Sequence, residues 1–403
     1  MATMTNRFAL PLLVALASPP ATAALGLPLP SLPRAVDEVV QPALADTTRL
    51  ADERVARLRS LLRAHPRELA RDPRGELVVR GELLAIDPGP EALAAAASLG
   101  LRVREQRELP PLGLRVAVLE APPRRPLRRV LRALREADPT GHFDYNHVYL
   151  GAGPADAPPA GAAPAAGEGP VRIVGLVDGG VDAGVAGADP GRLQRHGCPQ
   201  APVDPHGSAV ARLLLEEPRV QLRAADIYCG QSTGGSVVRL AEAMAWLAGE
   251  RATVVNLSLV GPENALLGRL VESMQARGHV LVAAVGNDGP AAPPLYPAAY
   301  PGVIGVAGVD ARGRALPESG RGPHVDFAAL GLFEAPDAAG KPRRWRGTSF
   351  AAPRVARRAA LAVDAPAPDA LALAMRALAA QATDAAPAGR DPATGEGVLG
   401  PTR

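Results

Sequence analysis

Short apolar runs alternate with amphipathic segments over most of the chain after residue 170. Nearly continuous apolar runs of this length are typical of strands that are buried on both faces. They occur at 171–177, 220–227, 253–259, 280–284 and 303–309. Between them, the spacing of apolar residues predicts helices at 208–215, 237–247 and 265–277. Strands that alternate with helices predict an α/β fold, in which helices cover both faces of a parallel sheet.

The pattern before residue 150 predicts a smaller α+β domain. Its expected strands are 76–86, 101–105, 114–119 and 142–150, and its expected helices are 90–98 and 126–137. The order βαββαβ is typical of a ferredoxin-like sheet with two helices on one face. Upstream of it, residues 35–69 have leucines at helical spacing, with no readable role.

Composition shifts suggest where the domains begin and end. Arg7, the apolar run that follows it and the small residues Ala21 and Ala23 are typical of a signal peptide. Residues 151–169 are nearly all Gly, Ala and Pro, as in a linker. The expected parts are a signal peptide (1–23), a leader with a helical segment (24–75), the ferredoxin-like domain (76–150), the linker (151–169) and the α/β domain (170–403). No later apolar run is long enough to span a membrane, so we expect a secreted or periplasmic protein.

Charge and cysteine content narrow the classes of function. The net charge is only +3, and the arginines are scattered among acids, which argues against nucleic-acid binding. Cys198 and Cys229 are the only cysteines, and an oxidising compartment favours a disulfide between them over two buried free thiols. The cysteine spacing does not suit zinc and His-Glu-x-x-His is absent, so we expect no metal and no cofactor.

Four side chains suggest nucleophilic catalysis. Ser349 follows Gly-Thr at the start of an alanine-rich run, where a helix N-terminus would favour a developing anion. His206 precedes an apolar helix, and Asp178 and Asn287 follow buried strands. Such groups can meet in one crevice at the carboxyl ends of a parallel sheet. Asp178 would then orient His206, His206 would take the proton of Ser349, and Asn287 would donate to the oxyanion.

The order Asp, His, Asn, Ser with these flanks resembles the subtilisin-like serine protease (subtilase) family from about residue 170 onward. The resemblance implies a serine endopeptidase that hydrolyses peptide or protein substrates. It also implies that residues 76–150 are a propeptide, which acts as an intramolecular inhibitor and chaperone and is removed by self-cleavage within 151–170. The residues that it implies for substrate binding are Gly234, Gly235, Ser258, Leu259, Val260, Ala284 and Gly286.

Departures from the family pattern leave alternatives open. Arg212 and Arg357 stand where the family usually has glycine between two helices, so they should push the helices apart or turn to an acid or a partner. Val260 also replaces a usual glycine, which would narrow the cleft. Three milder departures are Gly179, where the family usually has Ser or Thr, Ser208, where it usually has Thr, and Phe350, where Met is common. A catalytically impaired relative that binds peptides or depends on a partner is therefore one alternative. A second is an α/β-hydrolase with Ser232 as nucleophile, because residues 230–234 read Gly-x-Ser-x-Gly.

Overall fold

The computed structural model describes residues 34–123, 125–153, 161–336, 341–384 and 388–400. The chain divides into two units after Ala43, and nearly all of the described residues belong to the larger one, Leu44–Arg403. The predicted signal peptide lies outside the described residues. The described helices include none that is long and apolar enough to cross a membrane.

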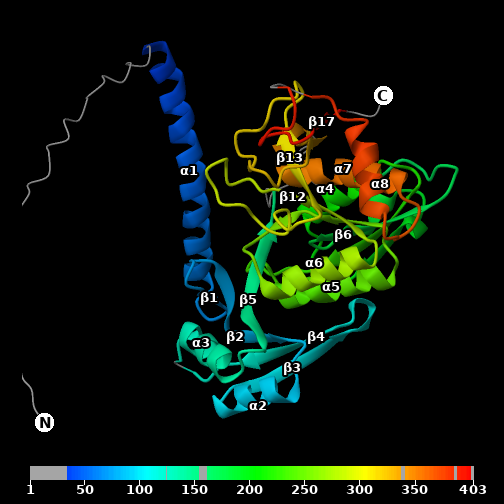
Figure 1. Ribbon diagram of the computed structural model, residues 1–403. Helices are drawn as coiled ribbons and strands as arrows, with labels where there is room; N and C mark the ends of the chain where they lie inside the picture. Colours follow the sequence, from blue (N-terminus) through cyan, green and yellow to red (C-terminus); the bar gives the residue numbers. More distant parts are fainter. Residues whose placement is uncertain (1–33, 124, 154–160, 337–340, 385–387, 401–403) are drawn as a thin grey trace, which may run out of the picture. The chain divides into compact units, whose positions relative to one another are not determined.

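A parallel sheet forms the centre of the second unit (Figure 1). Every neighbouring pair in it is parallel, as predicted. Across the sheet the strands are β17 (Val398–Leu399), β14 (Phe327–Leu330), β13 (Val303–Val309), β12 (Val280–Ala284), β10 (Val254–Leu257), β6 (Arg172–Asp178), β8 (Val220–Asp226) and β7 (Leu193–His196). The predicted run 253–259 is broken at Ser258, and its last part forms a separate short strand, β11 (Leu259–Val260).

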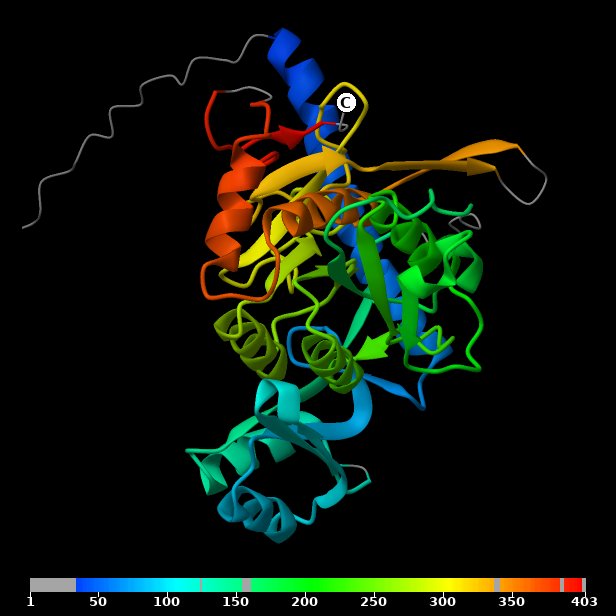
Figure 2. The same cartoon turned by 90° about the vertical axis from the view of Figure 1, so that its right-hand side faces the viewer.

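Helices cover both faces of this sheet, which confirms the predicted α/β class. One face packs against α4 (Pro205–Leu214), α7 (Thr348–Ala362) and α8 (Ala370–Ala379), and a continuous buried core fills the space between them. The other face packs against α5 (Val237–Gly249) and α6 (Ala265–Ala276). Beyond the sheet, β15 (Leu332–Pro336) and β16 (Pro342–Arg346) form an antiparallel pair, drawn in orange in Figure 2.

The N-terminal part of this unit has the predicted βαββαβ order. Its elements are β2 (Leu77–Ile86), α2 (Pro90–Ser98), β3 (Arg102–Leu109), β4 (Leu114–Glu120), α3 (Leu127–Ala137) and β5 (His142–Gly151), and a short β1 (Leu69–Arg71) pairs with β2. The sheet order β5-β2-β4-β3 is antiparallel. In both views, α2 and α3 lie on the side of this sheet away from α5 and α6. The domain boundaries at 76, 150 and 170 stay a prediction.

The N-terminal sheet and the α/β part share one buried core. Leu84, Val116 and Val118 of the small sheet belong to the same apolar cluster as Leu240 of α5 and Leu270 of α6. Burial of apolar side chains on both sides of this contact stabilises it by roughly 25 cal/mol per Å² of apolar surface.

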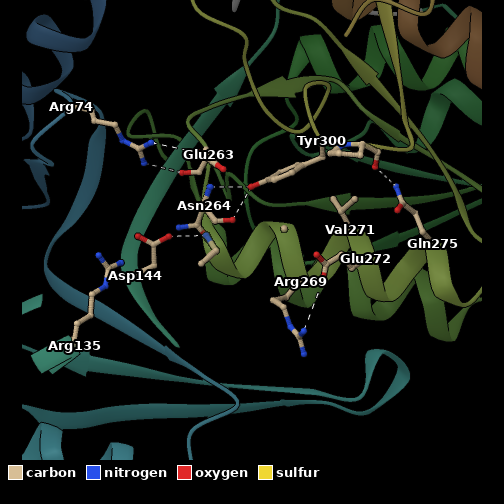
Figure 3. Close-up of a pocket in the computed structure, with 13 residues that line it drawn as sticks. Arg74, Arg135, Asp144, Glu263, Asn264, Arg269, Val271, Glu272, Gln275 and Tyr300 are labelled. Atoms are coloured by element: carbon tan, nitrogen blue, oxygen red, sulfur yellow. Dashed lines mark hydrogen bonds and ion pairs between the residues drawn. The ribbon is translucent and has the colours of Figure 1, made fainter. Parts of the chain in front are cut away.

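Polar contacts fix the start of α6 against the small sheet. The Asp144 carboxylate accepts a hydrogen bond from the Ala265 backbone N–H at 2.7 Å, where the helix dipole favours a negative charge. Asn264 caps α6 through its Oδ1, and its Nδ2 donates to the Tyr145 carbonyl at 3.0 Å. Figure 3 shows this junction, which lines a pocket that contains none of Asp178, His206, Asn287 or Ser349.

Candidate active site

Asp178 and His206 meet at the carboxyl end of the parallel sheet. Asp178 is the last residue of β6 and is fully buried, and its Oδ1 lies 2.9 Å from His206 Nδ1. Because a carboxylate only accepts hydrogen bonds, Nδ1 carries the proton and Nε2 is left as the basic nitrogen. Asp178 Oδ1 also accepts from the Gly179 backbone N–H at 2.7 Å, which fixes the carboxylate.

A second carboxylate, Asp204, sets the position of His206. Helix α4 begins at Pro205, three residues earlier than predicted, so His206 lies in its first turn and not before it. Asp204 is the N-cap, and its Oδ1 accepts from the His206 backbone N–H at 2.8 Å. Its own N–H donates to the Gly180 carbonyl at 2.7 Å, which holds the start of α4 against the turn after Asp178.

The charge around His206 favours its protonated form. Burial alone would lower the pKa of His206, because a charged imidazolium is less stable away from water. The charge of Asp178, its hydrogen bond to the ring and the charge of Asp204 outweigh this effect, so the pKa is raised above the ordinary value of 6.5. Burial, and then the charge of Asp178, raise the pKa of Asp204 itself.

Ser349 lies in the first turn of α7 and is fully buried. Neither its Oγ nor His206 Nε2 has a hydrogen-bond partner among the described residues. A Cβ atom built on Gly153 would overlap both atoms, so the two face the same point in the cleft. Gly153 therefore lies directly beside both the hydroxyl and the basic nitrogen.

The Asn287 side chain is held in one orientation by the start of α7. Its Oδ1 accepts from the Thr348 backbone N–H at 2.8 Å, and Thr348 Oγ1 accepts from the Gly286 N–H at 3.2 Å. The amide nitrogen therefore points into the cleft, where Nδ2 donates to the carbonyl oxygen of Ala152. A donor fixed in this way can stabilise an oxyanion that forms on that oxygen.

Residues 148–153 lie in the cleft as an extra antiparallel strand. The end of β5 pairs with β9 (Gly235–Ser236) on one side, where Tyr149 faces Gly235. On the other side it pairs with β11, where Gly151 faces Leu259 and Leu150 faces Val260. The Ala152 N–H continues this ladder by donating to the Ser258 carbonyl at 3.0 Å.

The residues predicted to bind substrate divide into two groups. Five of them line the strand 148–153: Gly234, Gly235, Ser258, Leu259 and Val260. Gly234 allows the closest approach, since a Cβ there would lie 2.6 Å from the Tyr149 carbonyl oxygen. Ala284 and Gly286 lie deeper, at and just after the end of β12, and Gly286 faces the side chains of Val260 and Leu295.

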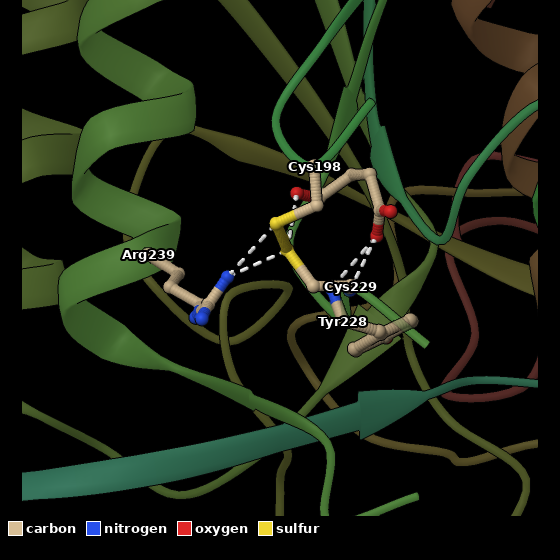
Figure 4. Close-up of a disulfide and its surroundings, with 5 residues drawn as sticks. Cys198, Tyr228, Cys229 and Arg239 are labelled. Carbon is tan, nitrogen blue, oxygen red and sulfur yellow. Dashed lines mark hydrogen bonds between the residues drawn. A yellow bond between two sulfur atoms is a disulfide. The ribbon is translucent and has the colours of Figure 1, made fainter. Parts of the chain in front are cut away.

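Cys198 and Cys229 form a disulfide, shown in Figure 4. Their Cα atoms are 5.3 Å apart, and the bridge closes the chain around α4 and β8. Arg239 of α5 donates from Nη1 to Cys229 Sγ at 2.6 Å. The bridge therefore ties the loop that precedes His206 to the end of a strand beside β6.

Comparisons with known proteins indicate the family. A model of the subtilase family matches residues 197–397. The chain belongs to the subtilase family. It is 35% identical over 146 residues to Subtilisin Savinase of Lederbergia lenta, which is 36% of this chain and 54% of Savinase. It is also 35% identical over 146 residues to an alkaline protease of Alkalihalobacillus alcalophilus, with 38% of that protein covered. The chain thus spans about half, or less, of the length of these curated relatives.

The fold likeness of this subtilase extends beyond the matched segment. Fervidolysin from Fervidobacterium pennivorans, described as a keratinolytic enzyme related to subtilisin, superposes with a TM-score of 0.63 at 19% identity. The superposition covers 82% of this chain and 61% of fervidolysin. That is more of the chain than residues 170–403 alone, so the likeness of fold includes part of the N-terminal region.

The two arginines at usual glycine positions turn to one acid. Arg357 of α7 donates to the Leu213 carbonyl at 3.0 Å and forms an ion pair with Glu216. Arg212 of α4 lies 3.7 Å from the same carboxylate, and Arg354 lies 3.9 Å from it. The helices α4 and α7 therefore meet through a cluster of three arginines around Glu216. This is the acid-directed outcome that we predicted as one possibility.

The other departures also have local explanations. A Cβ on Gly179 would overlap the Asp204 carboxylate, so glycine there makes room for the residue that caps α4. Ser208 Oγ donates to the Asp204 carbonyl at 2.9 Å and accepts from the Asp182 N–H at 3.0 Å. Phe350 packs beside the His206 ring, with the ring centroids 5.6 Å apart.

Ser232 does not sit in the setting that an α/β-hydrolase nucleophile needs. Its Oγ lies 3.0 Å from His65 Nε2, and His65 precedes it in the chain. Of the two downstream histidines, His279 bonds instead to the Ala252 carbonyl.

Sequence reasoning missed several residues around the cleft. Asp204 had a usable signal, because Asp-Pro just before an apolar run is typical of a helix N-cap. Ala152 and Leu295 had no such sequence signal, and neither did the contact between the N-terminal helix and the loop that carries Asn287.

The N-terminal helix contacts the loop that carries Asn287. The described side chains of α1 (Arg34–Ala64) begin at residue 49. Arg54 Nε lies 3.0 Å from Asp288 Oδ2, and its Nη1 lies 2.9 Å from Glu76 Oε1. Arg57 lies 3.1 Å from the other oxygen of Asp288.

The far end of α1 is followed by His65, which bonds to Ser232 on the opposite side of residues 148–153. The helix therefore links both sides of the cleft above the bound strand.

Proposed function

We propose that this subtilase is a serine endopeptidase made as a self-inhibited precursor. One observation carries the proposal: a peptide bond of the chain itself, Ala152–Gly153, lies at the candidate catalytic groups. Its carbonyl oxygen accepts from Asn287, and the Gly153 backbone lies against Ser349 Oγ and His206 Nε2. The neighbouring residues are paired on both sides as an extended strand, which is how an edge-bound peptide is held for reaction.

The proposed mechanism assigns one role to each of four residues. His206 Nε2 removes the hydroxyl proton as Ser349 Oγ attacks the substrate carbonyl carbon, and Asp178 stabilises the imidazolium that forms. Asn287 Nδ2 stabilises the oxyanion of the tetrahedral intermediate, a donor that is typically worth about 10²–10³ in kcat. His206 then gives the proton to the departing amine, and water hydrolyses the acyl-enzyme by the same steps.

The precursor part of the proposal concerns residues 76–152. They would act as the propeptide, with the end of β5 filling the cleft and the small sheet packed on α5 and α6. Cleavage between Ala152 and Gly153 would then be the maturation step, narrower than the range 151–170 expected from the sequence. Export through the predicted signal peptide, and action on proteins outside the cytoplasm, belong to the same proposal.

The N-terminus of the processed protein tests this proposal. We expect the purified full-length chain to convert to a form that begins at Gly153, while the Ser349→Ala variant stays intact. A fluorophosphonate probe should label Ser349 in the processed form, because only an activated serine reacts. The Ser232→Ala variant serves as the matched control and should label like the wild type.

Two results would contradict the proposal. An intact wild-type chain that the probe does not label would favour the catalytically impaired alternative. Loss of labelling in Ser232→Ala, with Ser349→Ala still labelled, would favour the hydrolase alternative.

A further inference from the structure

The residue before the proposed cut, Ala152, lies between two segments of the cleft wall, at Ser258 and at Asn287. Ala152 is buried in the same apolar cluster as Val260, Ala284 and Leu295. Its N–H bonds to Ser258 and its carbonyl to Asn287, so the residue is held at both ends and its side chain has little freedom to move. A larger side chain at this position would need space between the strand 258–260 and the turn at Gly286.

That space is already occupied. A Cβ on Gly286 would lie only 2.7 Å from Leu295 Cδ1 and 3.4 Å from Val260 Cγ1. Val260 is 5% exposed and Leu295 is 3% exposed, so neither has open solvent to move into. Protein interiors tolerate added atoms poorly, because overpacking forces neighbours out of their preferred rotamers.

The large buried side chain of the bound strand is Tyr149 and not the residue before the cut. Residues 151–153 read Gly-Ala-Gly, whereas Tyr149 is fully buried and donates from its hydroxyl to the Pro262 carbonyl at 2.8 Å. A Cβ on Gly261 would lie 2.5 Å from the Tyr149 ring, so the ring packs directly on that backbone. The buried ring anchors the strand where the residue before the cut contributes little apolar area.

We propose that Val260 and Leu295 restrict cleavage to bonds that follow a small residue: Ala, Gly or Ser. This inference rests on the proposed peptidase function and adds its substrate preference. The restriction acts on the acylation step, because a residue that cannot enter the closed position cannot bring its carbonyl carbon to Ser349 and its oxygen to Asn287.

Self-processing of the full chain tests the inference. The Ala152→Phe precursor should process at least ~100-fold more slowly than the Ala152→Ser precursor, since an ill-fitting side chain costs about 10- to 200-fold or more in such pockets. Adding Val260→Gly and Leu295→Ala to Ala152→Phe should restore processing by at least ~10-fold. Restoration by enlarging the pocket distinguishes steric exclusion from misfolding of the Ala152→Phe chain.

Cleavage of short peptides by the processed wild-type enzyme tests the same preference independently. Quenched peptides Tyr-Leu-Gly-X-Gly should be cleaved after X at least ~100-fold faster, by kcat/KM, when X is Ala than when X is Phe. Equal cleavage of the two peptides, or Ala152→Phe processing as fast as Ala152→Ser, would overturn the inference and leave the peptidase proposal standing. Failure of every chain and peptide to be cleaved would overturn both.

Discussion

The contact between Arg54 and Asp288 should control how long the cleaved N-terminal part stays bound. Arg54 is only 10% exposed, and its partners Asp288 and Glu76 are 6% and 16% exposed. Replacing Arg54 with Met keeps the apolar stem but leaves two carboxylates without this guanidinium in the complex. Breaking a buried pair in this way typically costs about 3–5 kcal/mol. Because Asp288 keeps Arg57 as a partner, we take the lower end, about 3 kcal/mol, or a dissociation rate ~100-fold faster.

Arg57 provides the matched control, since it meets the same carboxylate but is 47% exposed. A half-exposed pair is screened by water and is worth about 0–1 kcal/mol, so Arg57→Met should speed dissociation by no more than ~5-fold. In the assay, the precursor is allowed to cleave itself, the complex is isolated, and after dilution the rate of fluorophosphonate labelling reports release of the N-terminal part.

A double-mutant cycle with Asp288→Asn then separates the two partners of Arg54. If Arg54 acts through Asp288, the double variant should be released much more slowly than the product of the single effects predicts. Additive effects would mean that Arg54 acts only through Glu76. Equal acceleration by Arg54→Met and Arg57→Met would refute the argument from burial altogether.

Three further sets of substitutions test the site and its supports. Asp204→Asn keeps the capping oxygen for the His206 N–H but removes a negative charge that raises the pKa of His206. The pKa of His206 should therefore fall. Because neutral His206 is the active form, the acid limb of the kcat/KM profile should move to lower pH. An unmoved acid limb would contradict the effect of the Asp204 charge on His206. Removing the disulfide by Cys198→Ser and Cys229→Ser should lower the free energy of unfolding by about 3–4 kcal/mol on the chain-entropy account. Urea denaturation measures this loss, and adding reductant to the wild type should cause a loss of the same size. Glu216→Gln leaves three arginines clustered without their acid and should lower the free energy of unfolding by about 2 kcal/mol in the same assay. The control Glu217→Gln removes the partner of Arg219 alone and should lower it by less than about 1 kcal/mol. Equal losses for the two variants would argue against the cluster.

The four candidate catalytic segments could be predicted because their signals are local. A buried strand that ends in a carboxylate or amide, and a helix that begins at a hydroxyl residue, are both visible within about ten residues of sequence. The start of α4 was predicted too late because Pro205 and Gly207 look like helix breakers. In the structure Pro205 is the first helical residue, where it lacks only an N–H that no helix bond needs, and Asp204 caps it.

The contents of the cleft could not be predicted, because they depend on pairing between distant segments. Ala152 and Asn287 are 135 residues apart in sequence. The strands that hold residues 148–151, β9 and β11, each have only two residues, too few for any periodic pattern. The run 253–259 reads as one strand from its apolar residues, yet it breaks at Ser258, whose carbonyl accepts from Ala152. The break and this tertiary hydrogen bond fall at the same residue, and neither is visible in the apolar pattern.

The departures from the family pattern form pairs in space, which bears on whether they signal lost activity. Glycine at 179 and aspartate at 204 belong together, because a side chain at the first would displace the carboxylate of the second. Arg212 and Arg357 likewise approach Glu216, an acid just beyond α4: Arg357 forms an ion pair with it, and Arg212 lies 3.7 Å away. A site in decline would accumulate substitutions without compensation, and would leave buried charges unpaired at a cost of several kcal/mol each. Here Gly179 makes room for Asp204 and Arg357 pairs with Glu216, while Asp178 still bonds to His206 and Asn287 is still held by Thr348. These contacts therefore support the proposed peptidase over the proposed alternative that has lost its chemistry.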